Sequence, residues 1–349
     1  MAESVDTIII GAGIVGAGVA YALRGNASQT YLVEAESRSG TGTTSRNSGV
    51  IHAGLYYPGD SLKMKLCRRG AAMLYAFAAE HGVPHRKTGK YIVANSAEES
   101  AYLNLLLENV GGEIPLVETS TVPNGIRAER ALFSPNTGLV DIHVLVDALL
   151  EASGVSVLFN QRVTGLKLAG KQVSLEIGGE SYLANRVVNC AGLAAPVLGG
   201  RPHHFLAKGS YFQIRIPKEV EVPDLVYPAV PKGHPGLGIH LTRNLAGEAY
   251  LGPDVRWVDR EDYGVDPADA DRFFLAASRY LPWLRLGDLQ PGYAGLRPKL
   301  KREGFNDFIF PVEGECGQLV HCLGIESPGL TAAMAIGEHV RALLEGVGT

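Results

Sequence analysis

The fold is decided near the start of the chain by residues 5–34, whose sequence is VDTIIIGAGIVGAGVAYALRGNASQTYLVE. The apolar run Val5 to Ile10 has the pattern of a buried strand, and Gly11-Ala12-Gly13-Ile14-Val15-Gly16 follows it at once. Residues 17–23 then have the pattern of a helix, and a second strand, residues 30–33, ends on Glu34. Glycines at the first, third and sixth positions of a strand-to-helix turn, with an acid after the next strand, predict a dinucleotide-binding unit.

Each residue type in this turn has a physical role. We expect Gly11 to form the tight turn, Gly13 to let the backbone approach a pyrophosphate at the helix N-terminus, and Gly16 to allow close packing of helix and strand. The Glu34 carboxylate can accept hydrogen bonds from an adenosine ribose. The predicted cofactor-binding residues of this segment are Gly11, Gly13, Ile14, Val15, Gly16, Glu34 and Ala35. The segment alone leaves the choice between NAD and FAD open.

Length and composition predict a globular protein with a sizeable core. The chain has 349 residues, of which 46% are hydrophobic and 19% charged, so one large or two medium domains are expected. The net charge of -4, without a long basic run, argues against nucleic acid as the main partner. An anionic substrate would therefore need cationic residues placed locally in its site.

From the residues given, we expect no signal for secretion or membrane insertion. Residues 1–6 lack the basic and apolar regions of a signal peptide, and no stretch of 18 apolar residues occurs. We therefore expect a cytoplasmic protein without a transmembrane segment, and attachment to a membrane surface through an electron acceptor stays open. Four scattered cysteines (Cys67, Cys190, Cys316 and Cys322) favour small buried thiols, and the histidines show no metal-ligand spacing, so we predict no metal.

The later elements predict an α/β fold with an inserted β-meander. Helices are expected at 60–81 (ended by Gly82), 98–110, 141–152 and 328–344, and strands at 90–94, 155–159 and 318–323. Three short strands at turn spacing, residues 162–168, 173–177 and 186–190, form a meander that is typical of flavoproteins. Residues 205–295 are rich in strand patterns, with a hairpin at 238–252. Because the last strand and helix have the same pattern as the first ones, an apolar strand followed by a helix, we expect a discontinuous dinucleotide domain.

A second turn of interest is Gly324-Ile325-Glu326-Ser327-Pro328-Gly329-Leu330-Thr331. Ser327 is a good N-cap and Pro328 suits the first helical position. The partial positive charge of a helix N-terminus there would stabilise a reduced flavin and favour acceptance of a hydride. By itself the pattern also fits an ordinary capped helix. With the first turn it adds Ser327, Pro328, Gly329, Leu330 and Thr331 to the predicted cofactor-binding residues.

The run Thr43-Thr44-Ser45-Arg46-Asn47-Ser48-Gly49-Val50-Ile51-His52-Ala53-Gly54-Leu55-Tyr56-Tyr57 resembles the flavin-contacting loop of the D-amino acid oxidase superfamily of FAD enzymes. More narrowly, it resembles the L-2-hydroxyglutarate dehydrogenases and oxidases. Residues 208–212, 238–242, 295–299 and 324–331 are similar to motifs of the same family, and the resemblance spans nearly the whole chain. It implies a doubly wound, Rossmann-like FAD-binding domain over 1–86, 140–204 and 296–349. A mixed-sheet, substrate-binding domain would cover 87–139 and 205–295.

The resemblance also implies roles for single residues. Thr43, Thr44, Ser48, Gly49 and Val50 match the loop beneath the flavin ring, Val163 matches the position that meets adenine, and Cys190-Ala191-Gly192 match a tight turn near the cofactor. Arg297 matches the arginine that grips the substrate carboxylate. Some members tether the flavin through a cysteine just after that arginine. Here Pro298 and Lys299 stand in that place, so we expect non-covalent FAD, with His52 as the alternative tether.

Three side chains are the catalytic candidates. A guanidinium at Arg297 matches a carboxylate bidentately, although a salt bridge elsewhere in the chain is an equal alternative. His52 can take the hydroxyl proton as the C2 hydride leaves for flavin N5, or it simply orders its loop. His240 shares one strand face with Thr242, which faces either the pocket or solvent. The predicted substrate-binding residues are Arg297, His240, Tyr57, Lys208, Tyr211 and Lys299, and Lys208, Lys299 and Arg243 are the cations available for a second carboxylate.

The leading functional hypothesis is FAD-dependent oxidation of an L-2-hydroxy dicarboxylic acid. The expected reaction converts L-2-hydroxyglutarate to 2-oxoglutarate, with oxygen, a quinone or another carrier as the electron acceptor. One alternative is an amino-acid or glycine-type oxidase, which would share Arg297 but oxidise a C–N bond. A second alternative is a flavin-binding protein without small-molecule turnover.

Overall fold

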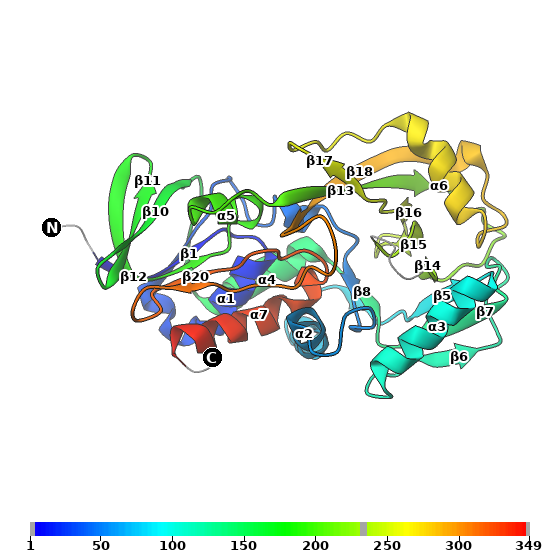
Figure 1. The fold of residues 1–349 in the computed structure, drawn as a ribbon, viewed down its shortest axis with the longest axis horizontal. Coiled ribbons are helices and arrows are strands. Elements are labelled where there is room, and N and C mark those ends of the chain that lie inside the picture. Colours follow the sequence, from blue (N-terminus) through cyan, green and yellow to red (C-terminus); the bar gives the residue numbers. More distant parts are fainter. Residues whose placement is uncertain (1–3, 231–235, 347–349) are drawn as a thin grey trace.

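The computed structural model describes residues 4–230 and 236–346, and Figure 1 shows their arrangement. Strands and helices build two large β-sheets and one small sheet, so the architecture is mixed α/β, as expected. Helices of the first half and of the C-terminal end lie together beneath the first sheet, and the second sheet occupies the other half of the molecule (Figure 1). None of the helices in the described part of the chain combines the length and apolar character that a membrane crossing requires.

The first sheet has the opening strand at its centre. β1 (Ser4–Ile10) pairs in parallel with β2 (Thr30–Val33) on one side and with β12 (Glu180–Asn189) on the other. β2 continues to β9 (Ser156–Leu158), and β12 also pairs in parallel with β20 (Leu319–His321), which pairs with β19 (Val312–Glu313). Strands from the beginning, middle and end of the chain thus meet in one sheet, as the discontinuous pattern predicted. The exact domain boundaries stay a prediction.

The expected meander is present, although its third strand is longer than predicted. β10 (Val163–Ala169), β11 (Gln172–Ile177) and β12 are antiparallel neighbours. The first half of β12 pairs with β11 from Glu180 to Ala184, whereas the sequence pattern placed the strand at 186–190. Residues 180–182 are exposed, so the apolar run that reveals the rest of the strand is missing there.

Four helices form the layer beside the first sheet, where they pack against its strands or against one another. They are α1 (Ile14–Ala22), α2 (Leu62–Glu80), α4 (Ile142–Ser153) and α7 (Gly329–Leu344). The crossing of α1 and α7 requires glycine, because a Cβ on Gly18 would lie 2.3 Å from the Ala333 carbonyl oxygen and one on Gly337 only 2.1 Å from the Gly18 carbonyl oxygen. The core between sheet and helices is therefore tightly packed, as protein interiors are.

Side-chain caps explain where the predicted helices begin. The Ser61 hydroxyl accepts a hydrogen bond from the Met64 amide at 3.2 Å, and Asp141 accepts two from the first turn of α4. Gly82, with φ of +67°, follows α2 in the left-handed conformation that suits glycine. The helices predicted at 60–81, 98–110, 141–152 and 328–344 are confirmed within two residues; α1 begins three residues earlier than expected, at Ile14.

The second sheet combines two stretches of the chain that are far apart in sequence. Its order is β17-β13-β16-β15-β14-β5-β7-β6, with β18 paired to β13. The bounds are β5 (Lys90–Ala94), β6 (Val117–Thr119), β7 (Arg130–Ser134), β13 (Phe205–Ile214), β14 (Leu225–Pro228), β15 (His240–Arg243), β16 (Ala249–Gly252), β17 (Arg256–Val258) and β18 (Leu289–Lys299). The predicted hairpin is confirmed, since His240 pairs with Gly252 and Arg243 with Ala249. α3 (Ala97–Val110) and α6 (Ala270–Ala277) pack beside this sheet (Figure 1).

A small sheet joins the two halves. β3 (Val50–Ile51) pairs with β8 (Gly138–Val140), which also pairs with β4 (His85–Arg86). The remaining short elements are the helix α5 (Ala195–Leu198) and 3₁₀ turns at 24–29, 43–45, 192–194, 267–269 and 286–288. Because His52 directly follows β3, the small sheet fixes the backbone of that residue between the two halves.

Two local expectations are wrong. Ser327 does not cap α7: the N-cap position is Pro328, which makes no side-chain cap, and the helix starts at Gly329. The Ser327 hydroxyl instead lies 3.4 Å from His52 Nε2, so a tertiary partner has replaced the local one. Of the four cysteines, Cys67, Cys190 and Cys322 are buried as expected, but Cys316 is exposed because it lies in the turn between β19 and β20.

Candidate active site

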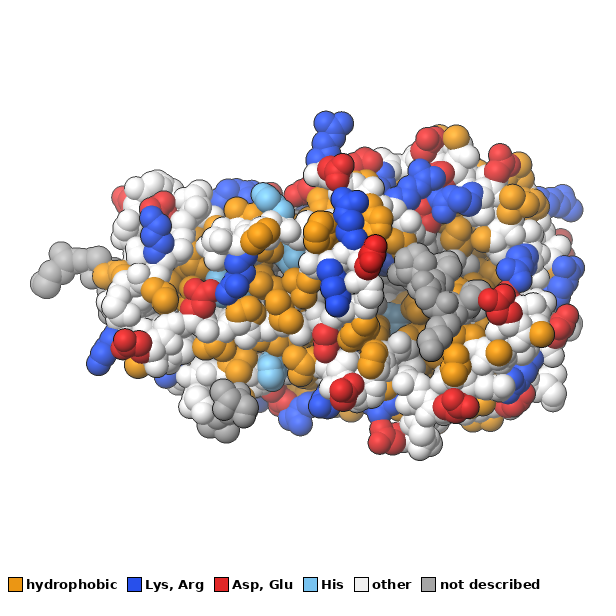
Figure 2. Space-filling model, viewed as in Figure 1, with side chains coloured by type: hydrophobic (Ala, Val, Ile, Leu, Met, Phe, Trp, Pro, Cys, Tyr) orange, Lys and Arg blue, Asp and Glu red, His pale blue; other side chains and the backbone are white. Residues whose placement is uncertain are grey.

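A cavity of about 400 Å³ runs from the first glycine turn to the second sheet. The β1–α1 turn and residues 190–194 line one end, and side chains of β13, β14, β15 and β18 line the other. Residues 325–330 lie between them. The face shown in Figure 2 carries acidic and basic side chains interspersed.

The end formed by the β1–α1 turn has the shape of a dinucleotide cradle. Gly11 has φ of +99°, and a Cβ there would lie 2.7 Å from the Cys190 carbonyl oxygen. A Cβ on Gly16 would lie 1.9 Å from the Gly11 carbonyl oxygen, so neither position accepts a side chain. Gly13 lines the cavity at the N-cap of α1 without a side-chain cap. The Ile14 amide donates to Thr44 Oγ1 at 3.1 Å, whereas the Val15 and Gly16 amides have no partner among the described residues and can bind an anionic group such as a pyrophosphate.

Glu34 is held in place at the same end. Its Oε2 accepts a hydrogen bond from the Ala12 amide at 2.6 Å, and its Oε1 accepts one from the Glu36 amide at 2.8 Å. Each carboxylate oxygen keeps a further lone pair, so Glu34 can also accept hydrogen bonds from ribose hydroxyls. These residues fit the adenosine end of FAD.

The structure brings most predicted cofactor residues to the cavity wall. Those that line it are Gly11, Gly13, Ile14, Val15, Glu34, Ala35, Thr43, Thr44, Ser48, Val50, Val163, Cys190, Ala191, Gly192, Ser327, Pro328, Gly329 and Leu330. Gly16, Gly49 and Thr331 lie behind this wall. The Thr331 hydroxyl accepts a hydrogen bond from the His52 amide at 3.0 Å, so it supports the site indirectly. Asn47, Gln161 and Arg162 also line the cavity. The sequence did not single them out as cofactor residues, although Asn47 lies within the run 43–57 and Arg162 begins a predicted strand.

Two histidines face the other end of the cavity. His240 Nδ1 lies 2.8 Å from the Gly238 carbonyl oxygen and therefore carries the proton, and its ring stacks on Tyr227 at 3.7 Å. His52 Nδ1 is buried and makes no hydrogen bond within the described residues. Burial, followed by the positive charge of Lys90, lowers the pKa of His52 to about 3; burial also lowers that of His240 to about 3, aided by Arg297. Both rings are thus neutral at pH 7, and a neutral imidazole has one ring nitrogen with a free lone pair.

Arg297 supplies an unpaired positive charge to the same pocket. It lies on β18 opposite Ala207 of β13 and lines the cavity. Its guanidinium makes no side-chain hydrogen bond or ion pair with any residue in 4–230 or 236–346, yet its charge lowers the pKa of both histidines. A carboxylate from outside the chain can therefore pair with it bidentately.

The other predicted substrate residues are less exposed to the cavity. Lys208 pairs with Asp262 at 2.6 Å, Lys299 with Glu326 at 2.6 Å and Arg243 with Asp224 at 2.7 Å, and none of the three cations lines the cavity. Tyr211 lines it and accepts a hydrogen bond from Ser48 at 3.1 Å. Tyr57 lies outside the wall, where its hydroxyl interacts with Ser327. A role for these residues in binding substrate stays a prediction.

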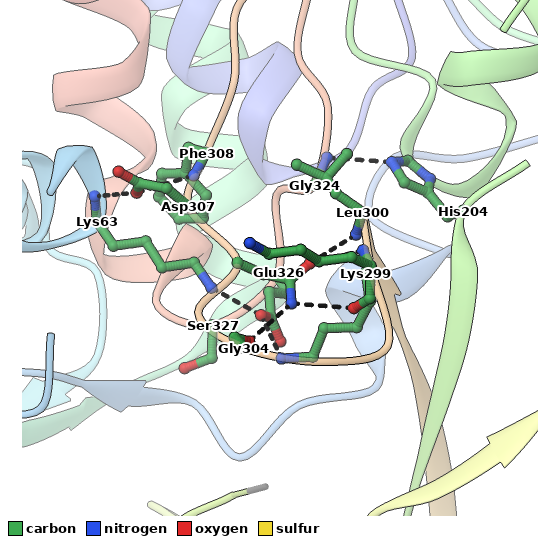
Figure 3. Close-up of polar contacts among 12 residues, drawn as sticks. Lys63, His204, Lys299, Leu300, Gly304, Asp307, Phe308, Gly324, Glu326 and Ser327 are labelled. Carbon is green, nitrogen blue, oxygen red and sulfur yellow. Dashed lines mark hydrogen bonds and ion pairs between the residues drawn. The ribbon is translucent and has the colours of Figure 1, made fainter. Parts of the chain in front are cut away.

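A buried charge cluster that sequence patterns did not indicate holds the 324–331 segment. Figure 3 shows Glu326 between Lys63 and Lys299, with its Oε1 accepting from Lys63 Nζ at 2.7 Å and from Lys299 Nζ at 2.6 Å. Burial alone would raise the pKa of Glu326, but the two lysines outweigh it and lower that pKa. The cluster thereby fixes Ser327 next to His52. Lys63 is 263 residues from Glu326 and Lys299 is 27 residues from it, so no local pattern reveals the cluster.

Replacing Glu326 with alanine should lower the free energy of unfolding by about 3–5 kcal/mol, because Lys63 would be left buried without a partner. Denaturant unfolding measures this loss. Because the pKa of Glu326 is lowered, its contribution is present above the ordinary value of 4.5 and is lost as the pH falls through the lowered value. The control is Glu345→Ala, which removes an exposed pair with Arg341 and should cost below about 1 kcal/mol. Equal losses in both variants would contradict the cluster's role.

Within the described residues, no three His, Cys, Asp or Glu side chains are grouped so that they could hold a metal ion.

Comparisons with known proteins agree on one family. The family model for FAD dependent oxidoreductases named DAO matches residues 6–343. The chain is 35% identical to the mitochondrial L-2-hydroxyglutarate dehydrogenase of Arabidopsis thaliana over 97% of this chain and 83% of that protein. Among solved structures, the L-alpha-glycerophosphate oxidase of Mycoplasma pneumoniae with FAD bound superposes with a TM-score of 0.89 at 24% identity, covering 98% of this chain and 95% of the other. The glycine oxidase of Geobacillus kaustophilus has a TM-score of 0.82 at 20% identity, covering 99% and 96%.

The two structural likenesses show the fold, and the family match covers nearly the whole chain. The glycine cradle and the position of Glu34 fit the dinucleotide half of the cofactor. The chain therefore belongs to the DAO family of FAD-dependent oxidoreductases, and FAD is its cofactor.

Proposed function

We propose that this enzyme oxidises L-2-hydroxyglutarate to 2-oxoglutarate. The observation that carries the proposal is the combination, in one cavity, of the unpaired guanidinium of Arg297 with the neutral imidazoles of His52 and His240. A 2-hydroxy acid needs both groups: a cation for its carboxylate and a base for its hydroxyl. The name of the Arabidopsis thaliana relative supports the choice of substrate.

Each residue has a defined part in the reaction. Arg297 binds the C1 carboxylate and thereby orients C2. The bound FAD would supply the acceptor for the C2 hydride. His52 takes the proton of the C2 hydroxyl, so the C2–O bond becomes a carbonyl and the substrate loses two electrons and two protons. The Thr331 hydroxyl and the Ser327 hydroxyl hold His52 in position through its amide and Nε2.

A set of substrates tests whether the enzyme requires a second carboxylate and whether it oxidises a C–O or a C–N bond. We expect kcat/KM to be far higher for L-2-hydroxyglutarate than for L-2-hydroxybutyrate, since remote binding energy contributes to orientation. L-Glutamate and glycine, which would require oxidation of a C–N bond, should react slowly or not at all. Equal rates with the two hydroxy acids would refute the dicarboxylate assignment. Faster reaction of either amino acid would instead support an amino-acid or glycine-type oxidase. If none of the four compounds reacts, a flavin-binding protein without turnover would be supported.

The mode of cofactor attachment gives a separate prediction. The purified protein should be yellow, and denaturation followed by removal of the precipitate should leave FAD in the supernatant, because Pro298 follows Arg297 where some relatives have a tethering cysteine. The absorbance of the supernatant measures the released flavin. Flavin that stays with the precipitate would show a covalent bond and would point to His52 as the tether.

A further inference from the structure

Lys90, the first residue of β5, places an ammonium group in the protein interior without a polar partner. The residue is 1% exposed, and its Nζ makes no hydrogen bond or ion pair in the described part of the chain. The Nζ lies 4.5 Å from the ring centre of Tyr56 and 4.5 Å from that of Tyr227. Cation–π attraction to two rings offsets part of the cost of burying a charge, but no carboxylate neutralises it.

This charge lies directly behind the substrate end of the cavity. The Tyr227 ring that contacts Lys90 also stacks on His240, and both Tyr227 and His240 line the cavity. The positive charge of Lys90 acts on His52 and on His240, in each case together with that of Arg297. Arg297 therefore lines this pocket and Lys90 lies behind its wall, and neither makes an ion pair within the described residues, although the charge of Arg297 also acts on the Glu326 carboxylate.

The pairing of the other lysines with little exposure sets Lys90 apart. Lys63 and Lys299 share Glu326, and Lys208 pairs with Asp262, so the chain supplies a carboxylate for each of these cations. A buried ammonium without such a partner costs stability, and an apolar side chain of similar length would avoid that cost. Buried charged groups without a partner concentrate at functional sites, where a bound ligand can supply the opposite charge.

We propose that Lys90 is a specificity-determining residue: it supplies the second positive charge that makes this pocket select a substrate with two carboxylates. Arg297 pairs with the carboxylate next to the reacting carbon, and the charge of Lys90, acting past the Tyr227 ring, stabilises the distal carboxylate. This inference rests on the proposed function. It assigns the second carboxylate to Lys90, because Lys208, Lys299 and Arg243 each have a carboxylate partner within the chain.

The first test measures binding of two unreactive ligands to the FAD-loaded enzyme by calorimetry. Glutarate has two carboxylates and butyrate one, and neither has a hydroxyl to oxidise. In wild type, glutarate should bind about tenfold or more tightly than butyrate, the size of one charge–charge interaction near a protein surface. Lys90→Met should remove most of this preference by weakening glutarate alone. Lys65→Met, which removes an exposed lysine of α2, should change neither affinity.

A second measurement needs only the wild-type protein. Burial lowers the pKa of Lys90 to about 7, so the preference for glutarate should decrease as the pH rises from 6 to 9 and Lys90 loses its charge. The neighbouring described groups do not titrate in this range: the pKa values of His52 and His240 are lowered to about 3, that of Cys67 is raised to about 12, and those of Tyr56, Tyr102 and Tyr227 are raised. Arg297 stays charged throughout.

Stability gives a third readout that a merely structural lysine would not produce. Because Lys90→Met removes an unpaired buried charge, its unfolding midpoint should be higher than that of wild type while its preference for glutarate is lost. If the midpoint of Lys90→Met were lower than that of wild type, the claim that Lys90 is a buried charge without a counter-ion would be contradicted.

The outcomes separate the two claims. Equal binding of both ligands by wild type would refute the dicarboxylate specificity itself and Lys90's role with it. A preference that persists in Lys90→Met would overturn the role of Lys90 and leave the proposed function intact. If the variant does not fold, a preference that is constant from pH 6 to 9 in wild type would overturn the inference equally.

Discussion

Replacing Arg297 with alanine is expected to lower kcat/KM for L-2-hydroxyglutarate by about 30- to 5,000-fold, which corresponds to about 2–5 kcal/mol of lost transition-state stabilisation. The guanidinium faces the cavity and has no ion-pair partner among the described residues, so a bound carboxylate would be its counter-ion. Because this contact also aims C2 at the cofactor, kcat should fall as well as affinity. Steady-state kinetics on the FAD-loaded variant measures both.

Two further variants show whether the geometry of Arg297 matters. Arg297→Lys keeps the charge but loses the planar fork, so it should remain well below wild type. Arg302→Ala removes an arginine of the same region, which pairs with the exposed Asp259, and its kcat/KM should be close to that of wild type. Full activity in Arg297→Ala would show that this position does not bind the substrate carboxylate.

Replacing His52 with alanine should slow bleaching of the flavin absorbance by L-2-hydroxyglutarate by roughly 10²-fold or more, the range expected when a general base is removed. The ring is neutral because burial and then Lys90 lower its pKa to about 3, so wild-type activity should not decline as the pH falls through 6.5. Anaerobic stopped-flow measurement from pH 5 to 8 tests the size of the effect and its pH dependence. The variant should keep FAD, since His52 is not part of the glycine cradle.

The control for His52 is the exposed histidine His203, whose replacement with alanine should leave the rate unchanged. A near-normal rate in His52→Ala together with a slow rate in His240→Ala would assign the base to His240. That residue faces the same cavity and its pKa is lowered to about the same value.

The sequence predicted those parts of the fold and site that depend on local rules. The glycine turn at 11–16 is recognisable because Gly11 and Gly16 have no room for a Cβ. The starts of α2 and α4 were predicted within two residues, and in the structure Ser61 and Asp141 cap these starts. The long pairing of β13 with β18 was not predicted, since nothing in either strand identifies its partner. Local rules also misplaced the start of α7, where Ser327 turns to His52 instead of capping its own helix.

The residues that sequence reasoning missed act through distant partners. Lys90 looks like an ordinary polar residue at the start of an apolar strand, and only the fold places it between Tyr56 and Tyr227. The sequence also did not show that Lys208, Lys299 and Arg243, whose role in binding a second carboxylate stays a prediction, each have an acidic side chain opposite. Whether a charged residue has a partner thus depends on residues that lie close in the fold but far apart or unrecognisable in the sequence.

The most direct measurement of the central claim is an anaerobic titration of the FAD-loaded enzyme with L-2-hydroxyglutarate, followed by assay of the product. The account predicts that one equivalent of substrate bleaches the flavin and that one equivalent of 2-oxoglutarate is formed. The same titration with D-2-hydroxyglutarate should leave the absorbance unchanged. An enzyme that stays yellow with the L-acid, or that is bleached without forming 2-oxoglutarate, would contradict the account.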